Sequence, residues 1–247
     1  MSGFALEISA INHQYKGQTV PSLSNINLSI KPLERFGLFG PNGAGKTTLM
    51  SLMTGLFKAE TGSVSLFGEK VFGNKNLKKR IGFVPQDFAF YPELSPKENL
   101  EFFGAWYGLN KGEIKNRIDE FLTVLGLTEV RNKPVKNFSG GMKRRINIAI
   151  GVMHKPEIIF LDEPTAGVDV QSRSAIIQYL KKLNEQGSTI VYTSHQLNEA
   201  EDLCDSIALI DEGKIIVNDH LNLLLSKFGE QNLEGLFLRL TGKAYRD

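Results

Sequence analysis

The chain has 247 residues, of which 41% are hydrophobic and 23% charged, a composition that argues against a disordered or fibrous protein. A formal net charge of +2 gives no support for a dedicated nucleic-acid binder, and the single cysteine, Cys204, cannot form an internal disulfide. Neither a signal peptide nor an apolar run of the roughly 20 residues that span a bilayer is recognisable. We therefore expect a cytoplasmic protein of one domain, whose membrane role, if it has one, comes through a partner.

The N-terminal part of the chain predicts a small antiparallel sheet. Residues 6–15 and 26–30 have the pattern of strands, and in the second the apolar residues alternate with polar ones, which is the period of a half-buried strand. Two further strands are predicted over residues 64–67 and 81–84, where glycine or proline marks the ends.

A glycine-rich loop separates a short apolar run from a predicted helix. Residues 36–39 are typical of a buried strand, and residues 47–54 of a helix that ends before Gly55. The pattern G-x-x-x-x-G-K-T between them turns backbone N–H groups into one concavity at a helix N-terminus, where an anion is favoured. Lys46 can reach the outer phosphates of a nucleotide, and the Thr47 hydroxyl can ligate Mg²⁺. This predicted phosphate loop consists of Gly40, Pro41, Asn42, Gly43, Ala44, Gly45, Lys46, Thr47 and Thr48.

The middle of the chain changes character. Helix patterns dominate over residues 99–107, 111–125 and 143–153, without a convincing strand, which indicates a helical insertion in an α/β core. An aromatic-rich segment opens this region, with the side chains of Phe88, Phe90, Tyr91 and Leu94. Such a cluster more often belongs to a core than to an interface, and it is also a candidate docking surface.

Two continuous apolar runs follow, over residues 158–161 and 189–193, and both are typical of buried parallel strands. An amphipathic helix lies between them, so strands alternate with helices and the sheet is expected to be mostly parallel. Asp211-Glu-Gly213 predicts a hairpin between residues 207–210 and 214–217. The predicted fold class is α/β, with a mostly parallel sheet, an N-terminal antiparallel part and a helical insertion.

The first of these apolar runs ends in two adjacent carboxylates, Asp162 and Glu163. Open α/β sheets bind ligands at the carboxyl ends of their strands, so we expect these acids beside the phosphates held by the loop. Asp162 is suited to hold Mg²⁺ through water, as the acidic partner of Thr47, and Glu163 can polarise a water for in-line attack on a γ-phosphate. An Asp-Glu pair alone would more often be a surface or capping feature; the apolar strand before it reverses that preference.

The order of these motifs is similar to that of the ATP-binding cassette (ABC) family of nucleotide-binding domains. The segment from Phe138 to Arg145, F-S-G-G-M-K-R-R, resembles the family signature, with phenylalanine and methionine in place of the commonest leucine and glutamine. The resemblance covers nearly the whole chain and implies a single ABC ATPase domain with a P-loop NTPase core. Its expected parts are a core with the antiparallel strands over residues 1–86 and 154–220, a helical subdomain over 87–153 and a C-terminal extension over 221–247.

The resemblance also implies roles for single residues. Tyr15 is similar to the aromatic that stacks on adenine, and Gln86 to the glutamine that senses Mg²⁺ and the attacking water. His195 resembles the switch histidine that contacts the γ-phosphate, and Asp169 lies in a segment like the loop that communicates between protomers. Each of these residues alone would more often be structural. The implied cofactors are ATP and Mg²⁺, with the metal held by Thr47, Gln86 and Asp162.

A second anion-binding helix N-terminus is predicted at Ser139, Gly140 and Gly141. One chain cannot easily bring both anion sites to one phosphate. In the resembling family two domains face each other head to tail, so that each ATP lies between the Lys46 loop of one protomer and the Ser139 loop of the other. The catalytic residues implied by the resemblance are Lys46, Gln86, Glu163 and His195.

The resemblance implies a homodimer or paired cassette on the cytoplasmic face of a membrane, with integral permease subunits docking near Gln86 and the helical subdomain, and no nucleic-acid partner. Residues 143–145 are interpreted as a solvated helix face in preference to a permease contact. Together with residues 233–242 they look like the branch of the family that powers exporters with separately encoded permeases. The alternative is a soluble ABC ATPase with non-membrane partners, such as the type that serves iron-sulphur assembly.

Overall fold

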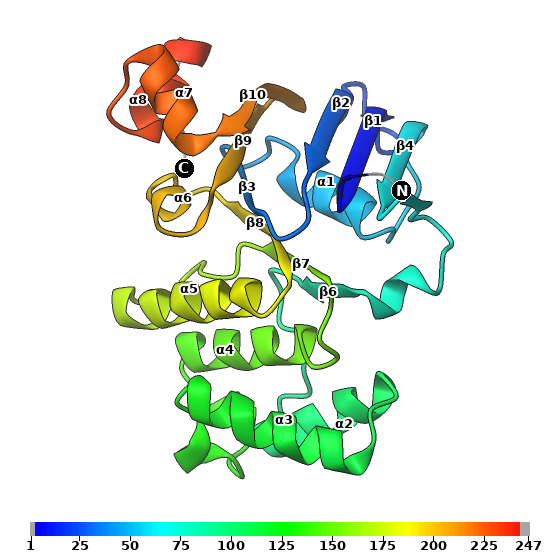
Figure 1. The fold of residues 1–247 in the computed structure, drawn as a ribbon, viewed down its shortest axis with the longest axis vertical. Coiled ribbons are helices and arrows are strands. Elements are labelled where there is room, and N and C mark those ends of the chain that lie inside the picture. The colour runs from blue at the N-terminus through cyan, green and yellow to red at the C-terminus, as the bar shows by residue number, and fades with distance from the viewer. Residues whose placement is uncertain (1–2, 243–247) are drawn as a thin grey trace. The chain divides into compact units, whose positions relative to one another are not determined.

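The computed structural model describes residues 3–242, and their contacts divide them into two compact units (Figure 1). The first unit combines residues 3–77 with residues 189–242, and the second consists of residues 78–188. Each unit has strands and helices of its own. The chain therefore passes once from the first unit into the second and then returns to the first.

The first unit contains an antiparallel sheet in the strand order β2-β1-β4-β5. The strands are β1 (Leu6–His13), β2 (Leu23–Ile30), β4 (Thr61–Leu66) and β5 (Glu69–Lys70). Leu6 of β1 is opposite both Ile30 of β2 and Leu66 of β4, and all three side chains are fully buried. The alternation predicted for residues 26–30 is confirmed, because the apolar positions are buried and the positions between them are exposed.

A mostly parallel group of strands forms the other part of the first unit. Strand β3 (Arg35–Phe39) lies between β8 (Thr189–Ser194) and β9 (Ser206–Asp211), and both pairings are parallel. Strand β10 (Lys214–His220) is antiparallel to β9, and Gly213 in the predicted hairpin turn has a φ of 71°, a conformation that favours glycine. The helices of this unit are α1 (Lys46–Met53), α6 (Asn198–Leu203), α7 (Leu221–Phe228) and α8 (Leu233–Thr241).

The second unit is mainly helical and contains the parallel pair β6 (Ile81–Val84) and β7 (Ile158–Asp162). Every residue of β7 is buried, as its continuous apolar run predicts. In Figure 1, α4 lies between α3 and α5. The helices are α2 (Pro96–Trp106), α3 (Lys111–Val124), α4 (Gly140–Gly151) and α5 (Val170–Glu185), with 3₁₀ turns at Leu77–Lys79, where the chain enters this unit, and at Thr128–Val130 and Val135–Asn137.

Side-chain caps fix where these helices begin. Ser95 and Glu98 form a capping box at the start of α2, and Asn110 and Glu113 form one at the start of α3. Ser139 caps α4, and its Oγ accepts a hydrogen bond from the N–H of Met142 at 3.3 Å. The helix starts predicted at residues 99 and 143 are therefore wrong by three residues, because the caps allow proline and glycine into the first turns of α2 and α4.

The arrangement confirms the predicted α/β class, with mostly parallel strands joined by helices, an antiparallel sheet near the N-terminus and a helical insertion. Among residues 3–242, no helix has both the length and the apolar character needed to cross a membrane.

Candidate nucleotide-binding site

The predicted phosphate loop joins β3 to α1 in the first unit, and its glycines are required by its geometry. Gly43 and Gly45 have φ values of 80° and 107°, which lie in the left-handed region. A Cβ atom on Gly40 would lie 2.1 Å from the carbonyl oxygen of Ile210, and one on Gly45 would lie 2.9 Å from that of Ser22. A loop of this shape therefore excludes larger residues at these positions, and glycine-rich loops of this kind direct backbone N–H groups toward an anion.

Lys46 lies inside this loop. Its side chain is 5% exposed, and Nζ donates hydrogen bonds to the carbonyl oxygens of Gly40 at 2.8 Å and Pro41 at 3.2 Å. Lys46 is also the first residue of α1, so its charge lies close to the N–H groups and the positive dipole end of that helix. The loop thus combines a buried cation with the N-terminus of a helix, which is the chemistry that binds phosphate.

Thr47 and Thr48 follow at the start of α1 with different surroundings. Thr47 is exposed and can present its hydroxyl to a metal ion bound with phosphate. Thr48 is buried, and its Oγ1 lies 3.2 Å from the hydroxyl of Tyr15. The residues therefore fit a Mg²⁺ ion that keeps water and phosphate oxygens among its ligands, because such an ion needs few protein groups.

Tyr15 lies beside the phosphate loop, with its hydroxyl 3.2 Å from Thr48 Oγ1. Its side chain is 40% exposed, and its ring meets His13 edge to face with centroids 5.0 Å apart. Phe57 contacts the same histidine ring at 5.0 Å. The strand predicted to reach Tyr15 ends at His13, because the next residues form a turn in which Gln18 N–H donates to Tyr15 O at 3.0 Å.

His195 follows directly after β8. The parallel register of β3 and β8 places Phe39 opposite Ser194, so the phosphate loop and His195 leave the sheet at the same edge. One unit of the fold thus contains three predicted site residues that are distant in sequence, namely Tyr15, Lys46 and His195.

In the second unit, the parallel pairing of β6 with β7 places Val84 opposite Leu161. Gln86 and the pair Asp162 and Glu163 therefore follow neighbouring strand ends. Gln86 Nε2 donates to Glu163 Oε2 at 3.4 Å, while Asp162 and Glu163 are 2% and 7% exposed. The two carboxylates are at the carboxyl end of a buried strand, as predicted, and one of them is in contact with the predicted glutamine.

Glu163 has an unusual backbone conformation, with a φ of 48°. A residue with a Cβ atom in this left-handed region costs on the order of 1–3 kcal/mol, and such strain tends to occur at functional sites. The backbone conformation changes here directly after β7, so Glu163 differs in conformation from the strand that ends at Asp162. This difference supports separate roles for the two acids.

The predicted second anion site begins α4. Ser139 and Gly140 are exposed, and a Cβ atom on Gly141 would lie 2.6 Å from Ser172 Oγ, so this glycine allows close approach to the start of α5. Asp169 caps α5, where its Oδ1 accepts from the Ser172 N–H at 2.9 Å. Hydrogen bonds from the backbone and side chain of Ser172 lower the pKa of the Asp169 carboxyl below its usual value. The signature segment and the Asp169 segment therefore meet within one unit.

The basic triplet of α4 is the clearest error of the sequence prediction. Arg144 is 5% exposed and donates to Gln86 O at 2.7 Å, and Arg145 donates to Leu125 O at 2.7 Å. The interpretation as a solvated face is wrong for Arg144, because it lies on the buried side of the helix. The available signal was the spacing of Arg144, Asn147 and Gly151, which places all three on one helix face.

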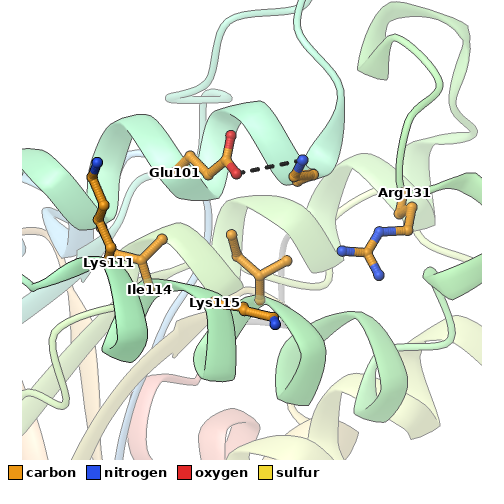
Figure 2. Close-up of a pocket in the computed structure, with 7 residues that line it drawn as sticks. Glu101, Lys111, Ile114, Lys115 and Arg131 are labelled. Atoms are coloured by element: carbon orange, nitrogen blue, oxygen red, sulfur yellow. Dashed lines mark ion pairs between the residues drawn. The ribbon is translucent and has the colours of Figure 1, made fainter.

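A separate groove of about 350 Å³ lies between α2 and α3 (Figure 2). Lys97 and Glu101 form an ion pair along one of its walls at 3.6 Å, and Ile114 and Ile118 are its apolar residues. None of the residues predicted to bind nucleotide lines this groove, which distinguishes it from the candidate site. Its lining consists of Lys97, Glu101, Lys111, Ile114, Lys115, Ile118 and Arg131.

Comparisons with known proteins show which family the chain resembles. Residues 23–166, more than half of the chain, match a family model described as ABC transporter. The chain is 46% identical over 226 residues to the linearmycin resistance ATP-binding protein LnrL of Bacillus subtilis (strain 168) and 36% identical over 212 residues to the Nod factor export ATP-binding protein I of Ralstonia nicotianae. These alignments cover 91% and 85% of the chain, and 72% and 65% of the two relatives.

Among solved structures, the dimeric ATP-binding cassette MJ0796, in a post-hydrolysis state bound to ADP and phosphate, matches with a TM-score of 0.80 and 29% identity. The match covers 87% of this chain and 98% of that one. That structure holds the products of ATP hydrolysis in the same fold.

Proposed function

Because the chain belongs to the ABC transporter family and is an ATP-binding, ATP-hydrolysing cassette of that family, we propose that it is the motor subunit of an exporter. In this proposal two copies close around two ATP molecules on the cytoplasmic face of a membrane. ATP binding closes the dimer, hydrolysis opens it, and the motion is passed to integral permease subunits.

The observation that supports hydrolysis most directly is the contact between Gln86 and Glu163. Glu163 is buried, its backbone is held in a left-handed conformation, and the Gln86 amide lies 3.4 Å from its carboxylate. A general base needs a fixed position and a neighbour that orients the water it activates.

We assign the steps to the residues as follows. Lys46 and the N–H groups at the start of α1 bind the β- and γ-phosphates. Thr47, Gln86 and Asp162 are the residues that would hold Mg²⁺, which when bound would neutralise charge on the phosphate oxygens. Glu163 takes a proton from water as the water oxygen bonds to the γ-phosphorus, and the bond between that phosphorus and its bridging oxygen breaks to leave ADP and phosphate. His195 contacts the γ-phosphate, and Tyr15 stacks on adenine.

The second half of each ATP site is assigned to the other copy. Ser139 and Gly140 are exposed at the capped N-terminus of α4, which favours an anion, and Gly141 is buried directly behind them. Asp169 is assigned to communication between the protomers because its segment packs against Gly141. A homodimer is sufficient, since one chain carries both kinds of half-site.

The export direction and the permease partner are proposed from the relatives. One similar protein is named for linearmycin resistance and another for Nod factor export, and both are named ATP-binding proteins. Permease docking is assigned to the surface near Gln86, where Phe88 and Tyr91 are 43% and 48% exposed. Exposed aromatic side chains of this kind commonly anchor protein interfaces.

The proposal is tested by replacing Glu163 with glutamine. Because an amide cannot accept the proton, turnover should fall by about 10²- to 10⁴-fold, the usual contribution of a general base, while ATP binding persists. Light scattering after size-exclusion chromatography should then detect a dimer that ATP stabilises. Glu157→Gln is the matched control, since Glu157 precedes the other end of β7 and pairs with Arg80. Normal turnover by Glu163→Gln would refute the assignment.

The partner is tested by purifying the chain from native membranes. We expect an integral permease to remain bound and to be identified by mass spectrometry. Recovery of a water-soluble partner alone would contradict the transporter role and favour a cassette with another task.

A further inference from the structure

One face of α4 is attached to β6 and to the segment that follows it, residues 85–89, which we call the glutamine loop. The attachment begins at the C-terminal end of α4. A Cβ atom on Gly82 would lie 2.7 Å from the carbonyl oxygen of Gly151, and one on Gly151 would lie 2.6 Å from Val84 Cγ2. Helix and strand therefore approach each other as closely as only glycine permits.

Asn147 makes the next attachment, one turn earlier in α4. It is 2% exposed, its Nδ2 donates to Pro85 O at 3.1 Å, and its Oδ1 accepts from the Ala89 N–H at 2.9 Å. One buried amide thus holds both ends of the glutamine loop. A buried polar group without a partner costs free energy, so neither end of the glutamine loop can separate from α4 unless another donor or acceptor replaces Asn147.

Arg144 makes the third attachment. Its Nη1 donates to Gln86 O at 2.7 Å, and its guanidinium carbon lies 4.8 Å from the centre of the Phe88 ring. Arg144 is 5% exposed, so its guanidinium makes the charge-assisted hydrogen bond largely out of water, while Phe88 covers one side of it and remains 43% exposed. The backbone of the predicted catalytic glutamine is therefore bound directly to α4.

The same helix begins at Ser139, five residues before Arg144, which is about 7.5 Å along the axis at 1.5 Å per residue. The other end of the connection is the Gln86 side chain, 3.4 Å from Glu163. A single helix thus carries the predicted anion-binding N-terminus and the fixed point of the glutamine loop.

We propose that Arg144 and Asn147 are positioning residues that lock the glutamine loop to α4, so that Gln86 and Ser139 shift as one body. The inference rests on the proposed function, in which Gln86 serves the ATP of its own chain and Ser139 serves the ATP of the partner. Arg144 and Asn147 thereby hold Gln86 in place at the ATP site of its own chain.

The kinetic test uses Arg144→Met, Gln86→Ala and the double variant in the full-length protein. Arg144→Met should lower kcat by about ten- to a hundredfold, the effect of displacing a catalytic group by up to about 1 Å, with the Kd for ATP unchanged. The double variant should be no slower than Gln86→Ala alone, because Arg144 acts through Gln86. Lys182→Met is the matched control: Lys182 is an exposed lysine of α5 in the same unit, outside the signature segment, and its replacement should leave kcat unchanged.

Arg144→Lys provides a second variant in case methionine prevents folding. An ammonium group can still donate to Gln86 O but cannot stack as a planar group on Phe88, so part of the lost kcat should return. We also combine Gln86→Ala with Arg144→Lys. If the losses of kcat multiply when Gln86→Ala is combined with Arg144→Met or with Arg144→Lys, the proposal is overturned, since Arg144 and Gln86 would then act independently.

A structural measurement tests the lock without any turnover. Amide hydrogen exchange at Ala89, whose N–H is bonded to Asn147, should become at least about tenfold faster in Asn147→Ala, because the opening of that bond controls exchange. Unchanged exchange at Ala89 would overturn the lock. A wild-type protein without ATPase activity would refute the proposed function instead, and the exchange result would still decide whether α4 holds the loop.

Discussion

Replacing Lys46 with methionine removes the ammonium group from the phosphate loop and keeps most of the side chain's length. Lys46 is 5% exposed and donates to the carbonyl oxygens of Gly40 and Pro41. A phosphate bound by the loop would therefore interact with the ammonium group of Lys46 in surroundings largely shielded from water. Methionine therefore tests the charge and leaves the shape of the loop nearly intact.

The expected loss of affinity follows from that environment. A hydrogen bond between charged groups contributes about 1.5–3 kcal/mol, and two unit charges 4 Å apart attract by about 4 kcal/mol at an effective dielectric constant of 20. We expect Lys46→Met to weaken Mg-ATP binding by about 2–4 kcal/mol, which is roughly 30- to 1,000-fold in Kd. The free energy of unfolding should change by less than about 1 kcal/mol, because the two lost hydrogen bonds are offset by removal of a buried charge.

Isothermal titration calorimetry with Mg-ATP and with adenosine checks this prediction. Only Mg-ATP binding should weaken, because adenosine has no phosphate for Lys46 to contact. Lys58→Met serves as the control, since Lys58 is an exposed lysine of the same unit. A Kd for Mg-ATP within threefold of the wild-type value would refute the phosphate role of Lys46.

Two further predictions concern the first unit. Tyr15→Leu should weaken ATP binding by about 1–2 kcal/mol, a typical loss when a base loses an aromatic partner, with tripolyphosphate affinity unchanged in the same titrations; equal losses for both ligands would exclude a role in holding the base. The Arg35 guanidinium is hydrogen-bonded to Asp205 and lowers the pKa of that carboxyl. The stabilising contribution of this pair is therefore complete above the unfolded-state pKa of about 3.9, and it is lost as the pH falls through the lower folded-state pKa. Asp205→Asn should therefore flatten the acid dependence of urea unfolding below pH 5, by less than about 1 kcal/mol because the pair is partly exposed; an unchanged dependence would contradict this assignment.

Local sequence patterns predicted the elements that carry the candidate site. The phosphate loop is recognisable because its glycines, lysine and threonine act through backbone conformation and helix position, which depend on neighbours in sequence. Asp162 and Glu163 are recognisable because the strand before them is apolar at every position. Both features are local, so no knowledge of distant contacts was needed.

The contacts of Arg144 were not predictable in the same way. Residues 143–145 have the composition of a solvated surface, and only the packing of α4 against β6 buries Arg144 on the carbonyl of Gln86. Gln86 and Arg144 are 58 residues apart in the chain, and a single sequence contains no signal for such a pair. The φ of Glu163 was equally hidden, because glutamate does not favour the left-handed region and nothing in its neighbours demands it.

The backbone of Glu163 has a consequence for how this protein can evolve. Glycine would adopt a φ of 48° without strain, and asparagine would do so more readily than glutamate. Substitutions that relieve the fold at this position are therefore the same substitutions that remove the proposed base. Thermostability and turnover favour opposite residues at position 163, and only selection for activity can keep a glutamate there.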